Sequence, residues 1–327
     1  MNNNNKNNNK NNKNNKNNNK NNEQRNIKTI GVVDIGSNTV KFVVYIYINR
    51  KLIRIYKDSE YIRLFNYLIK ENNNSNKYII SREGIEIAKK TLKDFKKEVD
   101  RFNLDVVLSF ATYTVRVAEN KDEFINEVKE YFNVKILSEK EEAYYSACGA
   151  LLDEEVIKNG NKGLICDMGG GSLELCKLDN NKINNCCSYP LGTLHFIKFF
   201  ENGTLKKEKE ARKLIRKHTE KYSDFKNFEN LICVGGSIRA VRNISNKIKL
   251  TKKELDNIFN EIKYLNPNEI IEKYNNISTK RSETVVPAVL AMSEIMKEYN
   301  CKYLIISKYG IREGVIINYL NGTYKQN

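Results

Sequence analysis

Apolar residues along the chain alternate between the two periods that distinguish strands from helices. Two β-branched runs, at 30–35 and 40–48, lie on either side of a Gly-Ser-Asn turn at 36–38, which predicts two antiparallel strands. Between residues 82 and 102 the apolar positions recur every three or four residues, which predicts a helix. Further strands are expected at 52–61 and 106–110, and further helices at 121–132 and 140–152.

The same order of elements begins again after residue 160. Short apolar strands surround a second glycine-rich turn at 169–172, and strand and helix patterns then alternate along the rest of the chain. The strands are expected at 163–167, 173–178, 182–189, 231–234 and 303–307. The helices are expected at 206–222, 238–246, 251–262, 281–299 and 311–320, the fourth of them interrupted by Pro287.

This repetition predicts the fold class. Each half opens with a strand, an Asp-x-Gly turn and two more strands before the α/β alternation starts, so two α/β domains of similar topology should meet at a cleft. The expected division is a tail at 1–25, a first domain at 26–145 and a second domain at 146–312. The last segment, 313–327, is expected to pack back on the first domain.

Composition and charge change this picture at the amino terminus. Sixteen of the first 22 residues are Asn, five are Lys, and no apolar residue follows Met1 there, so this tail is expected to be disordered. The chain carries 56 basic and 40 acidic residues, a net charge of +16, of which the first 25 residues contribute +5. The remaining +11 predicts attraction to polyanions such as nucleic acid, anionic lipid or phosphate-rich molecules, without choosing among them.

Other features bear on the location of the protein. No stretch reaches the roughly 18 apolar residues that a spanning helix needs, and the amino terminus has no apolar signal region, so a cytoplasmic protein without a membrane partner is expected. The seven Cys include no CxxC pair and are expected to be reduced thiols, mostly in the core. With only two His in the sequence, a structural zinc site is not expected.

The two turns carry the candidate chemistry. A turn with Asp and Gly gathers backbone N–H groups into a concave patch, and glycine lets an anion approach closely. Ser37, Asn38, Thr39 and Ser172 add neutral donors. A carboxylate beside a phosphate site requires a shared cation, and Mg²⁺ between Asp34 or Asp167 and a phosphate resolves that conflict. One such turn is a weak signal, but two at matching places are much stronger.

Two later segments have a similar form. The sequence 234–239 (Val-Gly-Gly-Ser-Ile-Arg) ends a strand and opens a helix, which suits an anion at the helix amino terminus beside Arg239. Residues 307–314 repeat this form with Lys308 and Arg312, although both segments are equally compatible with ordinary turns and surface cations. Glu141 and Glu142 precede an apolar helix face and by themselves indicate only acidic residues favoured by the helix dipole.

Taken together, the motifs resemble those of the exopolyphosphatase / guanosine pentaphosphate phosphohydrolase (Ppx/GppA) family, in its short two-domain form. The resemblance runs from about residue 30 to 315 and rests on eight segments in order: VVDIGSNTVKFVV, FATYTVRVAEN, ILSEKEEAYYSACGAL, LICDMGGGSLEL, PLGTLHF, LICVGGSIRAV, RSETVVPAVLAM and ISKYGIREGVI. It implies the duplicated, two-lobe, actin-like α/β fold with a cleft between the domains. It also implies release of the terminal phosphate of inorganic polyphosphate, or alternatively of pppGpp.

Residue roles follow from the resemblance. Glu142 matches the general base that activates the attacking water, and Asp34, Asp167 and Glu174 match the positions that hold Mg²⁺ or Mn²⁺, Asp167 also counting as catalytic. The phosphate-binding positions implied are Gly36, Ser37, Asn38, Thr39, Arg116, Gly169, Gly170, Gly171, Ser172, Gly235, Gly236, Ser237, Arg239 and Arg312. The sequence departs from the family pattern at Glu139 and Tyr144 beside the base, and Lys41 replaces the usual Arg.

Three other functions remain open from the sequence. A kinase or ATPase could use the same fold, and a non-catalytic binder of polyphosphate or alarmone could use the same cleft. Nucleic acid is an unlikely partner, because no aromatic stacking motif accompanies the basic residues. The resemblance also leaves a homodimer open.

Overall fold

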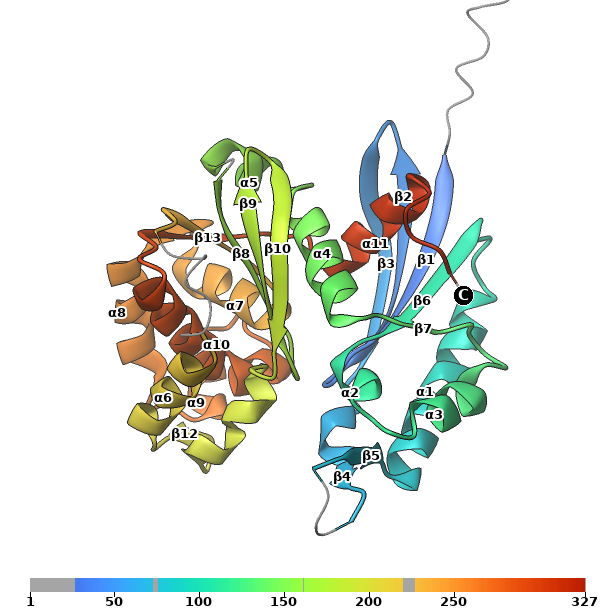
Figure 1. The fold of residues 1–327 in the computed structure, drawn as a ribbon, viewed down its shortest axis with the longest axis horizontal. Helices are drawn as coiled ribbons and strands as arrows, with labels where there is room; N and C mark the ends of the chain where they lie inside the picture. The colour runs from blue at the N-terminus through green and yellow to red at the C-terminus, as the bar shows by residue number, and fades with distance from the viewer. Residues whose placement is uncertain (1–26, 73–75, 161, 220–226, 327) are drawn as a thin grey trace, which may run out of the picture.

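The computed structural model describes residues 27–72, 76–160, 162–219 and 227–326, and these residues form two α/β lobes side by side (Figure 1). The predicted tail at 1–25 lies outside the described residues. We call the lobe built on the first sheet lobe I and the other lobe II.

Lobe I is a five-stranded sheet of order β3-β2-β1-β6-β7 with helices α1 and α3 packed together beside it. Strands β1, β2 and β3 are antiparallel neighbours, whereas β1, β6 and β7 run parallel. The elements are β1 (Lys28–Ile35), β2 (Val40–Ile48), β3 (Lys51–Glu60), η1 (Leu64–Tyr67), β4 (Leu68–Lys70), β5 (Tyr78–Ile80), α1 (Arg82–Val99), β6 (Val106–Ala111), α2 (Tyr113–Arg116), α3 (Lys121–Val128) and β7 (Lys135–Ile136).

Lobe II repeats this arrangement with a six-stranded sheet of order β10-β9-β8-β13-β15-β14. Again the first three strands are antiparallel neighbours, and β8, β13 and β15 run parallel. The elements from the connecting helix onward are α4 (Glu139–Ala150), α5 (Glu154–Asn159), β8 (Lys162–Met168), β9 (Leu173–Asp179), β10 (Lys182–Tyr189), η2 (Thr193–Phe199), β11 (Phe200–Glu201), β12 (Thr204–Leu205), α6 (Glu208–Thr219), β13 (Asn230–Val234), α7 (Gly236–Ser245), β14 (Lys249–Thr251), α8 (Lys252–Ile262), α9 (Pro267–Lys273), α10 (Thr279–Glu298), β15 (Tyr303–Ile306) and α11 (Ile311–Leu320).

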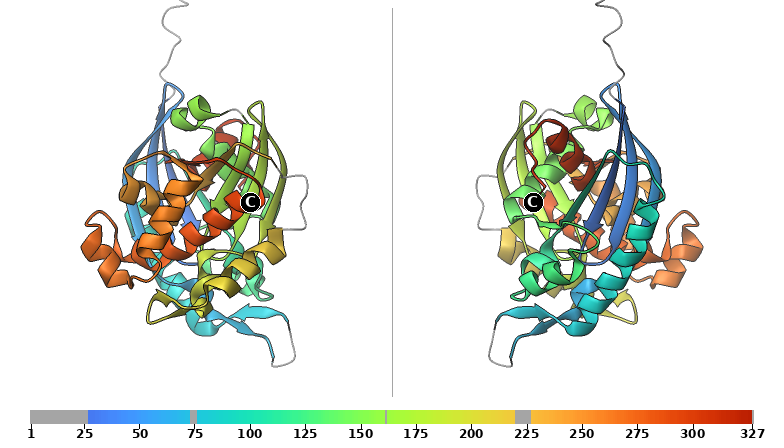
Figure 2. Two further views of the ribbon diagram at one scale, coloured as in Figure 1. Left: turned by 90° about the vertical axis from the view of Figure 1, so that its left-hand side faces the viewer. Right: turned by 90° about the vertical axis from the view of Figure 1, so that its right-hand side faces the viewer.

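The shared strand order confirms the duplicated, actin-like α/β fold that the sequence predicts. In Figures 1 and 2 the β2–β3 and β9–β10 hairpins extend to the same end of the molecule. The two Asp-x-Gly turns, which join the other ends of these strands, therefore lie together at the opposite end of the sheets.

Two sequence expectations are wrong in detail. Helix α10 continues through Pro287, because the proline and almost all of its helical neighbours are buried in lobe II and packing outweighs the lost backbone hydrogen bond. The seven Cys are not all free thiols, because Cys176 on β9 and Cys186 on β10 form a disulfide. These two strands are antiparallel neighbours, and their pairing brings the two side chains together in a way that spacing along the sequence does not reveal.

Helices α4 and α11 cross between the lobes, in the centre of Figure 1. Their backbones touch: a Cβ at Gly149 would lie 1.9 Å from the carbonyl oxygen of Gly310, and one at Gly314 would lie 1.8 Å from that of Tyr145. Helix α11 also packs on the lobe I sheet, where Val315 and Ile316 join the apolar cluster of β1, β2 and β6. The predicted domain boundary after residue 145 falls inside α4.

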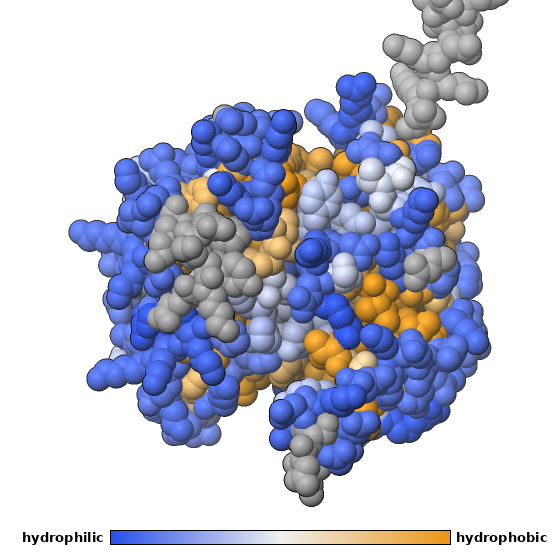
Figure 3. All heavy atoms as spheres, viewed as in Figure 1, coloured by the Kyte–Doolittle hydropathy of each residue, from blue (hydrophilic) through white to orange (hydrophobic). Residues whose placement is uncertain are grey.

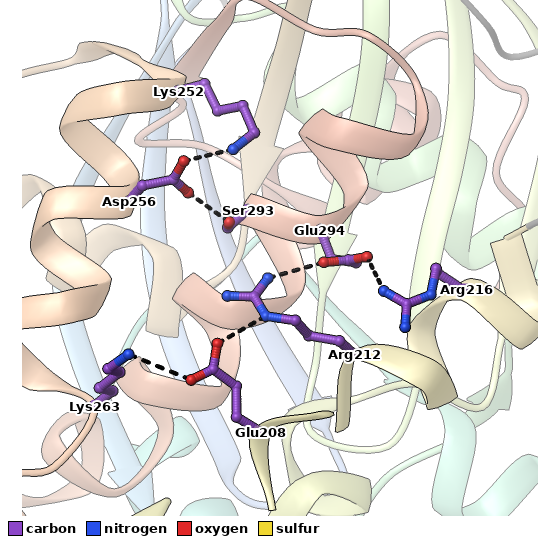
Figure 4. A network of polar contacts seen from close by, with 8 residues as sticks. All are labelled: Glu208, Arg212, Arg216, Lys252, Asp256, Lys263, Ser293 and Glu294. Carbon is purple, nitrogen blue, oxygen red and sulfur yellow. Dashed lines mark hydrogen bonds and ion pairs between the residues drawn. The ribbon is translucent and has the colours of Figure 1, made fainter. Parts of the chain in front are cut away.

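Buried polar contacts fix the helices of lobe II. Glu294 on α10 is 2% exposed and accepts hydrogen bonds from Arg212 at 2.8 Å and from Arg216 at 2.5 Å, both on α6 (Figure 4). Asp256 on α8 likewise accepts a hydrogen bond from Ser293 at 2.6 Å. Hydrophilic residues cover much of the face shown in Figure 3. Among the described residues, no helix is both long and apolar enough to cross a membrane.

The close helix crossing predicts an unusual response to Gly149→Ala. Alanine normally favours a helix over glycine by about 1 kcal/mol, but here its methyl group meets backbone that cannot turn away. We therefore expect a loss of about 2 kcal/mol or more in the free energy of unfolding, measured in urea. Lys140→Ala, on the exposed face of the same helix, is the control and should stay within about 0.5 kcal/mol of wild type. An unchanged or increased stability of Gly149→Ala would contradict the crossing.

Candidate active site

The two Asp-x-Gly turns have the same backbone closure. The N–H of Gly36 donates to the carbonyl of Thr39 at 3.1 Å, and the N–H of Gly169 donates to the carbonyl of Ser172 at 3.0 Å. Each turn directly follows the strand that carries its aspartate, β1 for Asp34 and β8 for Asp167. Equivalent elements of the two lobes thus present equivalent turns.

The turns are in van der Waals contact across the interface between the lobes. A Cβ at Gly171 would lie 2.3 Å from the Tyr113 ring and 2.6 Å from the Ser37 hydroxyl, and one at Gly170 would lie 3.3 Å from the Cβ of Asn38. Glycine at position 171 is required for this approach, since any side chain there would separate the lobes.

Beside this contact lies a cavity of about 460 Å³ that both lobes line. It brings together nearly every residue singled out from the sequence. The predicted site residues in its walls are Asp34, Gly36, Ser37, Asn38, Thr39, Glu142, Asp167, Gly169, Gly170, Gly171, Ser172, Glu174, Gly235, Gly236, Ser237, Arg239 and Arg312.

Arg116 is the exception. Its guanidinium donates to the Glu142 carboxylate at 2.5 Å and to the carbonyl of Leu137 at 3.0 Å, and it does not line the cavity. This position suits it to hold Glu142 in place rather than to bind phosphate. Lys308, which the sequence placed as a candidate for the same cleft, instead lies 3.8 Å from Asp153.

Glu142 lies in the first turn of α4. Ser138 and Glu141 form a capping box at the start of this helix, which occupies Glu141 and directs the next residue, Glu142, into the cavity. Apart from the resemblance, the sequence did not indicate which of these two glutamates would face the cavity. Burial raises the pKa of Glu142 to about 7; Arg116 opposes this rise, and the charges of Asp167 and Asp34 add to it.

Two more carboxylates and one hydroxyl lie side by side on neighbouring strands of the lobe II sheet. Asp167, Glu174 and Ser188 pair in register on β8, β9 and β10. Ser188 donates to Glu174 at 2.8 Å, and Ser146 of α4 donates to Asp167 at 2.5 Å. Burial raises the pKa of both carboxyl groups, and nearby negative charge adds to the rise.

Asp34 has the opposite environment. Its carboxylate accepts hydrogen bonds from Arg312 at 2.7 Å and from Lys41 at 3.2 Å. Burial works against ionisation, but the two cations outweigh it and hold the pKa of Asp34 below its usual range. Asp34 is therefore already neutralised, whereas Asp167 and Glu174 have no cation within ion-pairing distance among the described residues.

The donor set can be tested against a divalent cation. No group of three or more His, Cys, Asp or Glu side chains in the described residues could hold a metal ion by itself. Mg²⁺ commonly binds to one or two carboxylates and takes its other ligands from water and substrate phosphates. Asp167 and Glu174, buried next to each other with raised pKa values, fit that mode, and Asp34 fits it less well because Lys41 and Arg312 occupy its carboxylate.

Cations also line the cavity, and we call this set the cationic wall. Lys41, Lys57, Arg239, Lys280, Arg281 and Arg312 all line the cavity. For Lys57, Arg239 and Arg281 there is no ion pair with any carboxylate of the described part of the chain. Burial lowers the pKa of Lys57 to about 8 and that of Arg281 to about 10, and neighbouring positive charges contribute to both shifts.

Sequence reasoning missed Lys57, Lys280 and Arg281. They belong to β3 and to the start of α10, segments without a glycine-rich turn; Arg281 opens the RSETVVPAVLAM segment of the resemblance, which gave it no role. The Arg281 guanidinium lies against Gly236, where a Cβ would come within 2.0 Å of it. Gly236, the first residue of α7, thus leaves space for the side chain of Arg281 from α10.

The chain is similar in sequence and in fold to several known proteins. A Haemophilus influenzae protein named "Putative exopolyphosphatase" is 23% identical over 305 residues, which cover 89% of this chain and 91% of that protein. The structure is similar to that of the Aquifex aeolicus member of the Ppx/GppA family (TM-score 0.73, 21% identity, 91% of this chain and 100% of that chain). It is also similar to an exopolyphosphatase from Cytophaga hutchinsonii (TM-score 0.74, 20% identity, 91% of this chain and 99% of that chain).

The model of the Ppx/GppA phosphatase family matches residues 43–322, which include the second turn, the glutamate of α4 and most of the cationic wall. On this match, the chain belongs to the Ppx/GppA phosphatase family.

Proposed function

We propose that this phosphatase is an Mg²⁺-dependent exopolyphosphatase that releases orthophosphate from the end of inorganic polyphosphate in the cytoplasm. The observation that carries the proposal is the cationic wall. Lys57, Arg239 and Arg281 are held close together with no carboxylate partner among the described residues, at the cost of mutual repulsion. A linear polyanion would offset that repulsion along its whole length.

The reaction needs a positioned water and a base. Glu142, with a pKa near 7, is half ionised at neutral pH and can take a proton from water as the water oxygen bonds to the terminal phosphorus. The bridging P–O bond breaks in line, and the shortened chain leaves with the electron pair while orthophosphate is formed. Backbone N–H groups of the two turns would stabilise the charge on the equatorial oxygens.

Mg²⁺, held by Asp167 and Glu174, would supply positive charge next to the phosphate oxygens. Arg116 would hold Glu142 towards the cavity through its 2.5 Å hydrogen bond. Arg312 and Lys41, which bind Asp34, bring further positive charge to the first turn.

The cavity favours a plain phosphate chain over the alternative substrate pppGpp. A guanine base is commonly held against an exposed aromatic face, and the only aromatic residues lining the described cavity are Tyr61 and Tyr113. Arg63 covers the Tyr61 ring at 4.6 Å, and Tyr113 packs against His195 and Arg116. Arg281 against Gly236 similarly leaves little space for the adenosine that a kinase would bind.

The first test compares substrates. We expect orthophosphate release from polyphosphate to exceed release from pppGpp under matched conditions, and to fall to background when EDTA removes divalent ions. A much faster release from pppGpp would reverse the substrate assignment. Transfer of phosphate from ATP to an acceptor, with no release from polyphosphate, would replace the hydrolase by a kinase.

The second test removes the base. Glu142→Gln should lower kcat by about 10²- to 10⁴-fold, because the amide cannot accept the proton of the attacking water. Binding of polyphosphate, measured by titration calorimetry, should be retained, since Glu142 is not part of the cationic wall. Glu141→Gln, in the capping box, is the matched control and should keep near-normal kcat. Equal rates for Glu142→Gln and wild type would remove Glu142 from the mechanism.

The third test is the pH dependence of kcat/KM. Glu142 must be deprotonated to act as a base, so activity should be lost as pH falls through about 7. Lys41 and Lys57 must be protonated to attract phosphate, and burial lowers the pKa of each to about 8, so activity should also be lost as pH rises through about 8. The double variant Lys41→Arg/Lys57→Arg should keep its activity to higher pH, because arginine stays charged. An unmoved alkaline limb in that variant would contradict the role of the lysines.

A further inference from the structure

Residues 59–65 of lobe I, which we call the strap, reach across the mouth of the cavity to lobe II. The carbonyl of Ser59 accepts a hydrogen bond from Lys280 at 2.9 Å. The Tyr61 hydroxyl donates to Glu283 at 2.7 Å, and the Arg63 guanidinium donates to both oxygens of the same carboxylate at 2.9 Å each. Lys280 and Glu283 lie in the first turns of α10, so three strap residues are tied to one helix end of the other lobe.

Phe65, the last residue of the strap, also contacts lobe II. The Phe65 ring packs edge-on against His195 of lobe II, with 5.0 Å between ring centroids. Tyr113 packs on the same histidine at 5.8 Å. Ser59, Tyr61, Arg63 and Phe65 therefore all contact lobe II, although the backbone turns at Arg63 into the 3-10 helix η1.

The strap is also bonded to the first phosphate turn. The N–H of Arg63 donates to the carbonyl of Asn38 at 3.0 Å, and that of Phe65 donates to the carbonyl of Ser37 at 2.9 Å. The Asn38 side chain donates to the Tyr61 hydroxyl at 3.3 Å. The Oδ1 atom of Asn38 is buried and has no hydrogen-bond partner in the described structure, so the turn is not fully satisfied in this arrangement.

The strap backbone adopts an unfavourable conformation at Arg63, the residue that contacts both the first turn and Glu283. Arg63 has φ 50° and ψ 47°, in the left-handed region that costs an ordinary residue about 1–2 kcal/mol. Its two backbone and side-chain contacts, to Asn38 and Glu283, hold it there. Such strain persists only where surrounding contacts enforce it, and it is common at switch regions.

We propose that the strap is an interlobe latch that couples phosphate binding at the first turn to closure of the cleft. A phosphate on the Ser37–Asn38 backbone stabilises the turn, the turn holds the strap through Arg63 and Phe65, and the strap holds α10 through Glu283. Release of Glu283 frees Tyr61 and Arg63 from lobe II, which leaves only the contacts of Ser59 and Phe65 to hold the strap there and favours opening of the cavity. The inference rests on the proposed function only in naming phosphate as the ligand of the turn.

The exposure of the latch suits reversible opening. The side chains of Arg63 and Glu283 are 45% and 33% exposed, so water can replace their contact at low cost. The Glu294 pairs in the same helix α10 offer a contrast, since that carboxylate is 3% exposed and two arginines hold it permanently (Figure 4). One end of α10 is thus fixed inside lobe II, and the other makes contacts that can be exchanged.

Glu283→Ala tests the latch by amide hydrogen exchange of the whole chain. We expect faster exchange of the strap amides, which include those of Arg63 and Phe65, with unchanged exchange in the sheet of lobe I. In wild type, added orthophosphate should slow exchange in the 36–39 turn, in the strap and in the first turn of α10. In Glu283→Ala it should protect the turn but no longer the first turn of α10. Glu283→Asp, which keeps the charge, should restore part of the protection.

The matched control is Glu86→Ala, which removes an exposed glutamate whose ion pair with Arg82 lies within lobe I. Its strap exchange should equal that of wild type. If Glu283→Ala and Glu86→Ala exchange alike at the strap, or if orthophosphate protects α10 equally in both, the latch is refuted. Should Glu283→Ala fail to fold, as judged by circular dichroism, Arg63→Ala takes its place and must show the same loss.

The kinetic counterpart separates the latch from catalysis. Loss of an exposed ion pair should raise KM for polyphosphate by about two- to fivefold, with kcat within about twofold of wild type. Loss of kcat at unchanged KM would contradict the latch. If the protein hydrolyses no polyphosphate at all, the exchange response to orthophosphate still decides the inference, so failure of the proposed function and failure of the latch are distinguishable.

Discussion

The contact between the two glycine-bearing turns is the constraint on which the rest of the site depends. Gly171 touches Ser37 and Tyr113 so closely that no Cβ fits between the lobes. The strands that carry the turns fix where each aspartate lies, and the turn contact then fixes how far apart the two walls of the cavity are. The backbone approach of α4 and α11 at Gly149 and Gly310 supports the same spacing from the other side of the interface.

At that spacing, the charged side chains that line the cavity form a set of carboxylates and a set of cations. Glu142, Asp167 and Glu174 line one cavity and their pKa values rise, while Lys57, Arg239 and Arg281 line the same cavity and theirs fall. Each set is destabilised by its own members, and an intervening phosphate chain with a divalent cation would offset both. Asp34 has two cationic partners, Lys41 and Arg312, whereas Asp167, at the equivalent place in lobe II, has none among the described residues, so the two halves of the duplicated fold are not electrostatically equivalent.

How much of this the sequence could predict depends on whether a residue lies in a local motif. The turns at Asp34 and Asp167 can be identified from their glycines and from their repetition in the two halves of the chain. The same repetition predicts the duplicated α/β fold. Arg281 and Lys57 reach the cavity only through tertiary packing. Nothing near Lys57 in sequence distinguishes it from a surface cation, and the RSETVVPAVLAM segment that Arg281 opens does not indicate that its side chain lines the cavity. Arg116 lies in a segment of the resemblance, which implied that it binds phosphate. In the structure its guanidinium instead donates a hydrogen bond to Glu142. The Cys176–Cys186 bridge likewise depends on strand pairing rather than on spacing.

The duplicated turns are each held by a neighbouring segment of their own lobe, and these two segments differ in their contacts with the other lobe. The second turn is bonded directly to η2 of its own lobe: the N–H groups of Thr193 and Leu194 donate to Gly169 and Gly170 at 3.0 and 2.9 Å. A Cβ at Gly192 would come within 2.2 Å of the Gly170 carbonyl oxygen, so this support is as close as backbone allows. The first turn is held in the same way by the strap, where the N–H groups of Arg63 and Phe65 donate to Asn38 and Ser37 at 3.0 and 2.9 Å, but the strap also donates hydrogen bonds to Glu283 of the opposite lobe. Because the strap is bonded both to the first turn and to Glu283 of lobe II, the proposed latch would transmit occupancy of the first turn to both lobes, while the second turn keeps its place beside Asp167 and Glu174.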